Sequence, residues 1–504
     1  MNRSGNILVL AGMAPLAISV SGCGGIHEKP NILFVIADDQ SWPYASAYGS
    51  RCVHTPGFDY VAEHGTLFTN AYVTSPGSSP SRASILTGLY PWQIEEAGTH
   101  ASSFPSDHVC FPDVLSDNGY ATGYTGKGWG PGNWEISGRP HNPAGPVFNG
   151  ILLDPPYSGI SKIDYSANFT AFLDSIGEET PFCFWLGGHE PHRPYENMSW
   201  SKAGGSLDAA EVPGFLPEAD EVKSDILDYA VEIEWFDSHL VRCLDELDRR
   251  GMLDNTIIIV TADNGMSFPH AKANCYDAGI HVPMAVCWAD KWRNSEPEDH
   301  IVSSIDIFPT LLDAAGIEWA GRDRLQGESL TDLLEGHADI RKNEDIFAGR
   351  ERHSCSRHGN LGYPVRCVRS GEWLLIRNFH PERWPAGDPL AFDRKGKTVT
   401  AYYDMDAAPS KDYLTDHRTE PGVKEYFEAA VGLRPEYELY CLTSDPDCMD
   451  NMAYDRECRT ILDRLKTILD AKLRETGDPR VGDDPEIWET YPRLEGKMRE
   501  FPEN

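Results

Sequence analysis

Three stretches of the chain consist almost entirely of apolar residues, at positions 31–37, 182–186 and 256–261. Continuous apolar runs of this length are typical of strands that are buried on both faces, as in a sheet covered by helices. A shorter strand is expected at residues 120–126, directly after a predicted helix over residues 111–117. The pattern therefore predicts a sheet in the core of the protein.

Apolar positions follow a helical period elsewhere in the chain. Between residues 219 and 250 they recur at steps of three or four, from Ile226 to Leu247, which indicates a long amphipathic helix. A further helix is expected over residues 303–315. Strands that alternate with helices favour an α/β fold, in which a mostly parallel sheet is flanked by helices.

The pattern changes in the last quarter of the chain. Short strands are expected at residues 374–377, 399–402 and 437–440, and a charged helix follows over residues 456–475. A tail rich in proline and acidic residues completes the chain. This order is typical of a small antiparallel sheet packed with a helix.

The chain of 504 residues, 40% of them hydrophobic, can bury one large core and a second, smaller one. We expect an α/β domain over residues 30–375 and a C-terminal α+β unit with an acidic tail over residues 376–504. The formal net charge of −34 argues against a nucleic-acid partner, because phosphate contacts require a basic footprint.

Positive charge is nevertheless concentrated in one part of this acidic chain. Seven arginines and three glutamates lie between residues 350 and 383. The arginines either form a locally basic cleft that attracts anions or are paired in the core and on the surface. They are Arg350, Arg352, Arg357, Arg366, Arg369, Arg377 and Arg383.

The N-terminal segment has the pattern of a secretory signal. One positive charge, at Arg3, precedes an apolar run over residues 7–20 that is too short to span a bilayer. The following Val20-Ser21-Gly22-Cys23 resembles a bacterial lipoprotein processing site, which implies lipidation of Cys23 after removal of residues 1–22. The alternative is ordinary cleavage nearby. We expect an exported protein, anchored by lipid to a bacterial membrane in the periplasm or at the cell surface.

The cysteines do not indicate a metal-binding or redox motif. The chain has 12 cysteines but no Cys-x-x-Cys pair, which argues against a zinc ribbon or a thioredoxin-type site. Cys441 and Cys448 are close enough in sequence to pair across a turn, and the sequence leaves that pairing open.

Two of the predicted strands end in polar side chains that are suited to a metal ion. Asp38 and Asp39 follow the first strand, and Asp263 and Asn264 follow the strand at residues 256–261. Ligand sites in such sheets form at the carboxyl ends of the strands. Carboxylate and amide oxygens are hard ligands that suit calcium or magnesium, although the same residues are also common in turns.

Residues 78–88 read Ser-Ser-Pro-Ser-Arg-Ala-Ser-Ile-Leu-Thr-Gly. This segment resembles the signature of type I sulfatases, in which Cys or Ser is followed by x-Pro-Ser-Arg and then by Leu-Thr-Gly. In that family the first residue, here Ser78, is oxidised after translation to formylglycine, an aldehyde whose hydrate is the nucleophile. One hydroxyl of the hydrate attacks sulfur, and deprotonation of the other expels sulfate. The resemblance extends over residues 30–453 and implies an alkaline-phosphatase-like fold.

The resemblance also assigns roles to individual residues. It implies one divalent cation, usually calcium, bound by Asp38, Asp39, Ser78, Asp263 and Asn264. It implies that Arg82 steadies the aldehyde hydrate, that Lys127 and Lys272 bind sulfate oxygens, and that His192 lies near the leaving atom. The cation would lower the pKa of the nucleophilic hydroxyl and neutralise sulfate oxygens.

One position departs from the family pattern. The family has a histidine shortly after its Gly-Lys motif, and this chain has Trp129 there, in Gly126-Lys127-Gly128-Trp129. Tryptophan cannot accept a proton. Either His189 or His270 serves as the base instead, or turnover is slow, or the chain is a relative that has lost catalysis.

The details are most similar to the heparan N-sulfatase (sulfamidase) branch. The matching segments are residues 262–269, the His-x-Pro-His-Arg block at 189–193 and the block at 363–366. The resemblance implies a sulfated glycan substrate, such as a glycosaminoglycan or an algal polysaccharide, with N- or O-sulfate left open. The residues it suggests for substrate binding are His189, His270, Glu351, His353, Arg366, Arg377 and Arg383.

Two alternatives remain beside the sulfatase hypothesis. One is a phosphoryl hydrolase of the same superfamily that uses unmodified Ser78, and the other is a surface protein that binds glycans without turnover. The sulfatase hypothesis implies a further partner, because a serine at position 78 would be oxidised by a serine-type anaerobic sulfatase-maturing enzyme.

Overall fold

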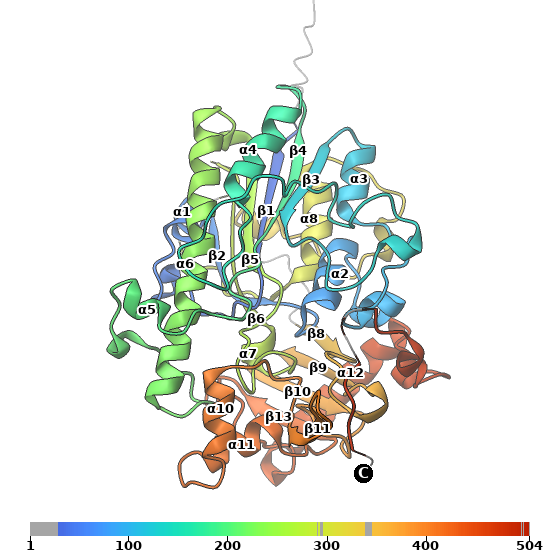
Figure 1. Cartoon of the computed structure of the whole chain (residues 1–504). Coiled ribbons are helices and arrows are strands. Elements are labelled where there is room, and N and C mark those ends of the chain that lie inside the picture. Colours follow the sequence, from blue (N-terminus) through green and yellow to red (C-terminus); the bar gives the residue numbers. More distant parts are fainter. Residues whose placement is uncertain are drawn as a thin grey trace, which may run out of the picture.

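The computed structural model describes residues 29–502 except 290, 293–295, 338–344, 495 and 497 (Figure 1). The predicted signal segment and Cys23 lie outside the described residues. Among the helices that are described, none combines the length and the apolar character that a membrane crossing requires.

A seven-stranded sheet forms the centre of the larger unit, with strand order β3-β4-β1-β5-β6-β2-β7. Its first four strands are parallel and confirm the four strands predicted from the apolar runs. They are β3 (Ala121–Gly126), β4 (Phe182–Gly187), β1 (Asn31–Ala37) and β5 (Thr256–Ala262).

The other half of this sheet was not predicted. Strand β6 (His281–Cys287) is antiparallel to both β5 and β2 (Thr66–Tyr72), and the short β7 (Val302–Ser303) pairs with the edge of β2. Strand β6 contains Pro283, which is unusual inside a strand, and β2 mixes apolar with polar residues. The sheet is therefore mixed, with the parallel strands predominating.

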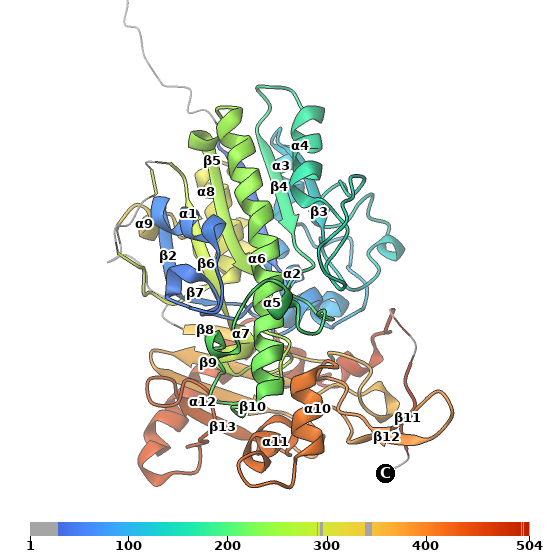
Figure 2. The same cartoon turned by 60° about the vertical axis from the view of Figure 1, so that its left-hand side comes forward.

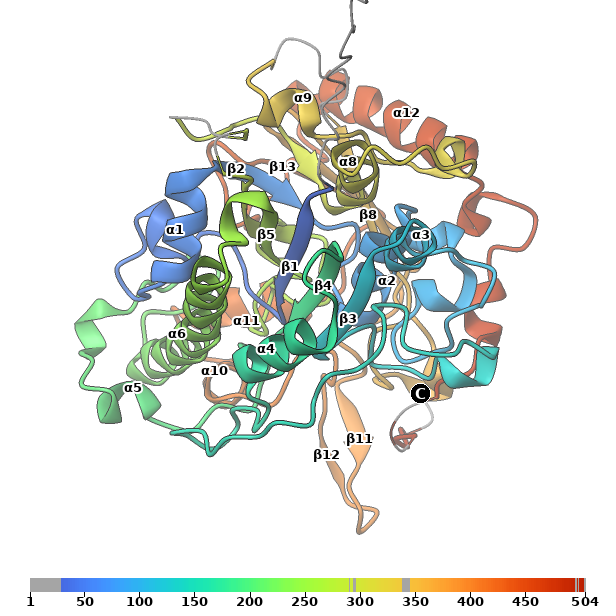
Figure 3. The same ribbon diagram turned by 90° about the horizontal axis from the view of Figure 1, so that it is seen from above.

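Helices cover both faces of the large sheet, as the alternating pattern predicted (Figure 3). On one face α6 (Asp220–Arg249) contacts α1 (Pro56–His64) and α4 (Tyr165–Ser175). On the other face α2 (Ser78–Thr87) contacts α3 (Phe111–Asp117) and α8 (Ile307–Ala314). The remaining helices are α5 (Ser199–Lys202), α7 (Asp277–Ile280), α9 (Thr331–Leu334), α10 (Pro409–Asp416), α11 (Lys424–Val431) and α12 (Arg459–Glu475).

A second, antiparallel sheet lies at the carboxyl ends of the parallel strands (Figure 2). Its strand order is β13-β10-β9-β8, and α12 packs against β9 and β10, as expected of an α+β unit. Its first strand in the sequence begins at Asp345. Its strands are β8 (Asp345–Arg350), β9 (Val365–Ser370), β10 (Trp373–Asn378) and β13 (Tyr437–Cys441).

Two smaller expectations about the C-terminal unit have clear outcomes. The strand expected at residues 399–402 is present as β12 (Thr398–Thr400), but it pairs with β11 (Leu390–Phe392) in a separate ribbon outside the second sheet. Cys441 and Cys448 do not pair, and all 11 cysteines within the described residues are free thiols.

Candidate functional site

The carboxyl ends of β1 and β5 bring the predicted metal ligands together. Ala37 and Ala262 are partners in the parallel ladder, so the residues that follow each strand lie side by side. The backbone N–H of Asp39 donates to Asp263 Oδ1 at 3.0 Å, and Asn264 Nδ2 donates to Asp39 Oδ1 at 2.8 Å. Asp39 has a φ of 74°, a left-handed conformation that turns the chain sharply after β1.

Ser78 lies at the first position of α2 and points at these ligands. Its hydroxyl donates to Asp38 Oδ1 at 2.8 Å and lies 3.4 Å from Asn264 Oδ1. The preceding Gly77 is closely covered, because a Cβ built there would lie 3.1 Å from His353 Nδ1. Ser78 itself is 1% exposed, so its hydroxyl is held in a defined direction.

Three buried carboxylates lie close together in this site. One oxygen each of Asp38, Asp39 and Asp263 lies within 4.8 Å of the others. Burial raises the pKa of Asp263 to about 6, and the nearby charge of Asp38 raises it too, although Arg82 and Lys127 oppose the shift. Clustered carboxylates with an amide and a hydroxyl oxygen beside them fit a hard divalent ion.

Arg82 is completely buried behind the ligands. Its Nε donates to Asp263 Oδ2 at 2.6 Å, and its Nη1 donates to the carbonyl oxygens of Lys127 at 2.7 Å and Gly128 at 3.1 Å. Arg82 therefore ties α2 to β5 and to the segment after β3. It holds Asp263 and the backbone of Lys127 in place.

Two lysines reach the ligands from opposite directions. Lys127 Nζ lies 2.5 Å from Asp38 Oδ2, and Lys272 Nζ lies 2.6 Å from Asp39 Oδ2 and 3.1 Å from Asp406 Oδ2. Burial lowers the pKa of Lys272, but Asp39 and Asp406 raise it by more, so the net pKa lies above its usual value. Lys272 is thus a cation.

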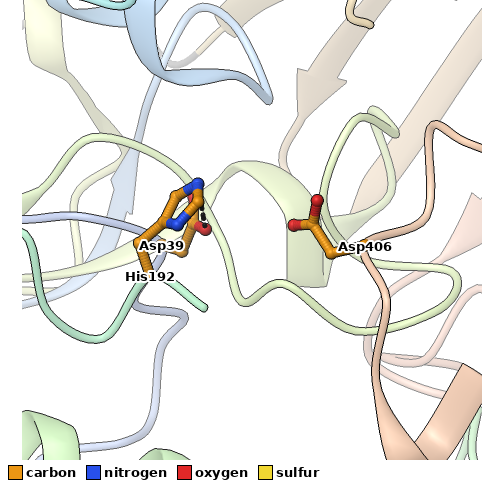
Figure 4. A group of neighbouring side chains, drawn as sticks. All are labelled: Asp39, His192 and Asp406. Carbon is orange, nitrogen blue, oxygen red and sulfur yellow. Dashed lines mark ion pairs between the residues drawn. The ribbon is translucent and has the colours of Figure 1, made fainter. Parts of the chain in front are cut away.

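His192 and Asp406 complete this group from two sides (Figure 4). His192 Nε2 lies 3.8 Å from Asp39 Oδ2, and its Nδ1 donates to the carbonyl oxygen of Arg193 at 2.7 Å. Asp406 faces the pair from the opposite side and comes from the segment between β12 and α10. Burial raises the pKa of Asp406, but Lys272, His192 and His353 lower it by more. The net pKa lies well below its usual value, so Asp406 is ionised.

A cavity of about 640 Å³ opens over this group, between the two sheets. It contains every residue that the sequence placed at the sulfate, except Arg82. Its described lining residues are Asp38, Ser78, His100, Lys127, Gly130, Pro131, Gly159, Ser161, His189, His192, Arg193, Lys272, His353, Ser354 and Asp406.

The structure separates the histidines that the sequence could not rank. His189 and His353 line the cavity, and burial lowers the pKa of each, to about 4 and about 3 respectively. His270 lies elsewhere, because its ring stacks on Tyr276 and its nitrogens face the carbonyl oxygens of Ala429 and Asp447. His270 thus holds two segments together and has no contact with the cavity.

Among the lining residues that sequence reasoning missed are His100 and Asp406. The rings of His100 and His353 lie 4.5 Å apart, and burial lowers the pKa of His100 well below its usual value. No local motif surrounds either residue, since each reaches the site from a loop between elements.

Besides His270, four residues suggested for substrate binding are absent from the described lining of the cavity: Glu351, Arg366, Arg377 and Arg383. Arg366 is 1% exposed and bridges Asp478 and Glu351, and Arg480 binds Glu351 from the other side. Arg377 pairs with Asp470 at 3.0 Å, and Arg383 pairs with Glu489 at 2.7 Å. Of the seven arginines between residues 350 and 383, none is among the described lining residues. The expected basic cleft is therefore not part of this cavity.

Trp129 is buried beside the nucleophile helix. Its indole N–H donates to the carbonyl oxygen of Ser79 at 3.0 Å, and its ring packs edge-on against Phe104. It is 3% exposed and is not among the described lining residues. Trp129 thus buttresses α2 and leaves proton transfer to other side chains.

This fold and this site define a hydrolase of the alkaline-phosphatase-like type, with a serine nucleophile position beside clustered acidic ligands. The sequence profile of the Sulfatase family matches residues 30–317, and the chain belongs to that family. The C-terminal profile of N-sulphoglucosamine sulphohydrolase matches residues 269–384, which confirms the sulfamidase-like branch.

Similar proteins agree with this assignment. An ulvan-active sulfatase of Formosa agariphila is 26% identical over 90% of this chain and 76% of its own length. Human N-sulphoglucosamine sulphohydrolase is 27% identical over 90% of this chain and 91% of its own length. A solved structure in complex with its substrate D-glucosamine-2-N,6-O-disulfate shares the fold, with a TM-score of 0.64 over 91% of this chain and 99% of that one, at 19% identity.

Proposed function

We propose that this sulfatase removes sulfate from sulfated glycans, with formylglycine formed from Ser78 and a bound calcium ion. The observation that supports this most strongly is the position of Ser78, whose hydroxyl faces Asp38 and Asn264 at the start of α2. The lysines that a sulfate group would need lie on either side, at Lys127 and Lys272.

The calcium ion would be held by Asp38, Asp39, Asp263, Asn264 and the side chain at position 78. When bound, it supplies Lewis-acid chemistry that polarises sulfate oxygens and lowers the pKa of the attacking hydroxyl. The hydrate of formylglycine supplies that hydroxyl and a second one, whose deprotonation releases sulfate.

The side chains of the cavity do the remaining work. Lys127 and Lys272 bind sulfate oxygens as cations and orient the sulfur toward position 78. His192 donates its Nδ1 proton to a backbone carbonyl, so its Nε2 is the nitrogen that exchanges a proton with the leaving atom.

We assign the proton acceptor for sulfate release to His189, which takes the place of the histidine replaced by Trp129. Its ring lines the cavity, and its pKa of about 4 leaves it neutral at pH 7. A neutral imidazole can accept a proton, whereas an indole cannot.

The proposed substrate class follows from the relatives and from the cavity. The names of the relatives specify ulvan, N-sulphoglucosamine, N-acetylgalactosamine-6-O-sulfate and N-acetylglucosamine-6-O-sulfate chemistry. A cavity of about 640 Å³ accommodates a sugar residue beside the sulfate. We propose a sulfated sugar of a glycan, carrying either N- or O-sulfate.

The proposal includes the route by which the enzyme matures. A serine-type anaerobic sulfatase-maturing enzyme would oxidise Ser78, and export with lipidation of Cys23 would place the enzyme at a bacterial membrane. Both steps rest on the sequence patterns at residues 78–88 and 20–23.

A phosphoryl hydrolase with two metal ions is the main competing function. Asp39, His192 and Asp406 have ligand atoms within 4.8 Å of one another, which is the arrangement that a second ion would use. Lys272, however, lies between Asp39 and Asp406 and donates to both, so its ammonium group occupies the place that a second ion would take. This favours a sulfatase site with a single divalent ion.

Sulfate release from 4-nitrophenyl sulfate tests the proposed function. Protein co-expressed with a serine-type maturing enzyme should hydrolyse this ester, lose activity with a calcium chelator and regain it with calcium. Ser78→Ala, produced in the same way, is the matched control and should be inactive. Hydrolysis of 4-nitrophenyl phosphate alone would contradict the proposal.

A further inference from the structure

The cavity has one end rich in cations and one wall without any available cation. Lys127 and Lys272 lie at the sulfate end with the nucleophile position. A third lining cation, Arg193, is fully engaged, because its two Nη atoms donate to both oxygens of Asp225 at 2.6 and 2.7 Å. We call the lining residues His100, His353, Ser354 and Asp406 the wall beside Lys272, because Asp406 contacts Lys272 and the rings of His100 and His353 lie 4.5 Å apart.

Asp406 is the charged group of that wall among the described lining residues. Its side chain is 29% exposed, and Figure 4 shows that it faces Asp39 and His192 from the far side. Lys272 lies closer to Asp39, at 2.6 Å, than to Asp406, at 3.1 Å, so it neutralises Asp406 only partly. A sugar whose sulfate reaches Lys272 therefore comes close to this carboxylate with the substituents next to that sulfate.

We propose that Asp406 selects sugars that carry a single sulfate and present a hydroxyl or N–H donor on the adjacent ring atom, and that it rejects sugars with a second sulfate there. This inference rests on the proposed function, because it takes the Lys127 and Lys272 end of the cavity as the sulfate site.

Charge and hydrogen bonding both favour the monosulfated sugar over the sugar with a second sulfate. A hydroxyl or N–H donor next to the sulfate makes a charge-assisted hydrogen bond with Asp406, which is stronger than a neutral one. A second sulfate at that position faces a like charge, and the wall offers no free lysine or arginine among its described residues to offset the repulsion. The neutral side chains of His100 and His353 can bond to hydroxyls but cannot neutralise a second anion.

The test measures binding without turnover, on the full chain that still carries Ser78 and is saturated with calcium. The two probes are glucosamine N-sulfate and glucosamine 2-N,3-O-disulfate, whose sulfates are on adjacent atoms. Whichever sulfate of the second probe enters the site, the other one is attached to the neighbouring ring atom. Calorimetry should show that the protein prefers the monosulfated probe by about 10-fold or more, the factor that corresponds to one charged hydrogen bond.

Variants separate the role of Asp406 from general damage. Asp406→Asn removes the charge with little change in shape and should reduce this preference by about 10-fold. Asp406→Glu keeps the charge and should still bind the monosulfated probe more tightly. Asp412→Asn, at an exposed position of α10, makes the same change in net charge and should leave the preference unaltered.

Several outcomes would overturn the inference. These are equal binding of the two probes, no binding of either probe, or an unaltered preference in Asp406→Asn. The proposed function is tested separately with the matured protein and 4-nitrophenyl sulfate. This ester has no substituent next to its sulfate that could bind or repel Asp406. Sulfate release from that ester without probe preference refutes the role of Asp406 alone, and preference without sulfate release refutes the catalytic proposal alone.

Discussion

Replacing Arg366 should destabilise the protein without weakening substrate binding. Arg366 lies on β9 at the centre of a buried ion network, with its Nε 2.6 Å from Asp478 Oδ2 and its Nη2 2.6 Å from Glu351 Oε1. The side chains of all three residues are between 0 and 3% exposed. Arg366→Met would remove the cation and leave Asp478 buried with a reduced set of partners.

The magnitude follows from the burial of the pair. Removing one member of a buried ion pair costs about 3–5 kcal/mol, because the remaining charge has lost its compensation. Arg480 stays bonded to Glu351 at 2.7 Å, so the loss falls mainly on Asp478. We expect Arg366→Met to lower the free energy of unfolding by about 3 kcal/mol.

Arg377→Met is the matched control. Arg377 also pairs with an aspartate, Asp470, but the two side chains are 23% and 41% exposed, so solvent screens their attraction. Such a pair contributes about 0–1 kcal/mol. Urea unfolding followed by fluorescence compares the two variants, and KM for the sulfated substrate is measured on the folded fraction. An Arg366→Met protein that unfolds like the wild type but has a raised KM would refute this reasoning and return Arg366 to the substrate site.

Three further predictions concern other parts of the site and its supports. Glu232 on α6 is 2% exposed with a pKa of about 9, so it is protonated in the folded protein and ionised when unfolded. The cost to folding of keeping this carboxyl protonated is absent below its unfolded pKa. As pH rises from there toward 9, the free energy of unfolding falls by about 1.4 kcal/mol per pH unit. Glu232→Gln should thus stabilise the protein more at pH 8 than at pH 5, and equal gains in thermal unfolding at both would contradict this. Lys272→Ala should lower kcat/KM at least about 100-fold while Lys272→Arg retains more activity, since a cation must remain between Asp39 and the sulfate; equal activity of the two variants would count against that role. Trp129→Phe should cost about 1 kcal/mol in unfolding free energy through loss of the bond to the Ser79 carbonyl, with kcat reduced only a few-fold; a loss of kcat above about 100-fold would show that the indole acts in the reaction.

The grouping of Asp38 and Asp39 with Asp263 and Asn264 could be predicted because it depends on local patterns. The apolar run of β1 ends at Asp38 and that of β5 at Asp263, and in-register pairing then brings the two ends together. The strands with mixed or irregular sequence were missed. Pro283 within β6 and the polar Thr69 and Asn70 of β2 conceal strands that only the neighbouring strands make stable.

The roles of the charged residues in the C-terminal unit could not be predicted from local sequence patterns. Arg366 looked like part of a basic cleft, but its partner Asp478 is 112 positions away in the sequence and reaches it only through the fold. Asp406 was overlooked for the same reason, since Lys272 lies 134 positions from it. A sequence lists the charges of a chain, but the tertiary structure decides which of them are neutralised.

Mass spectrometry of the peptide that contains residue 78 tests the central claim most directly. The protein is co-expressed with a serine-type maturing enzyme, and a sulfatase known to be converted serves as the control. The account predicts loss of two hydrogens at Ser78, an adduct with an aldehyde-reactive hydrazine, and sulfate release that rises with the converted fraction. An unmodified serine under conditions that convert the control, or a converted protein that releases no sulfate, would contradict it.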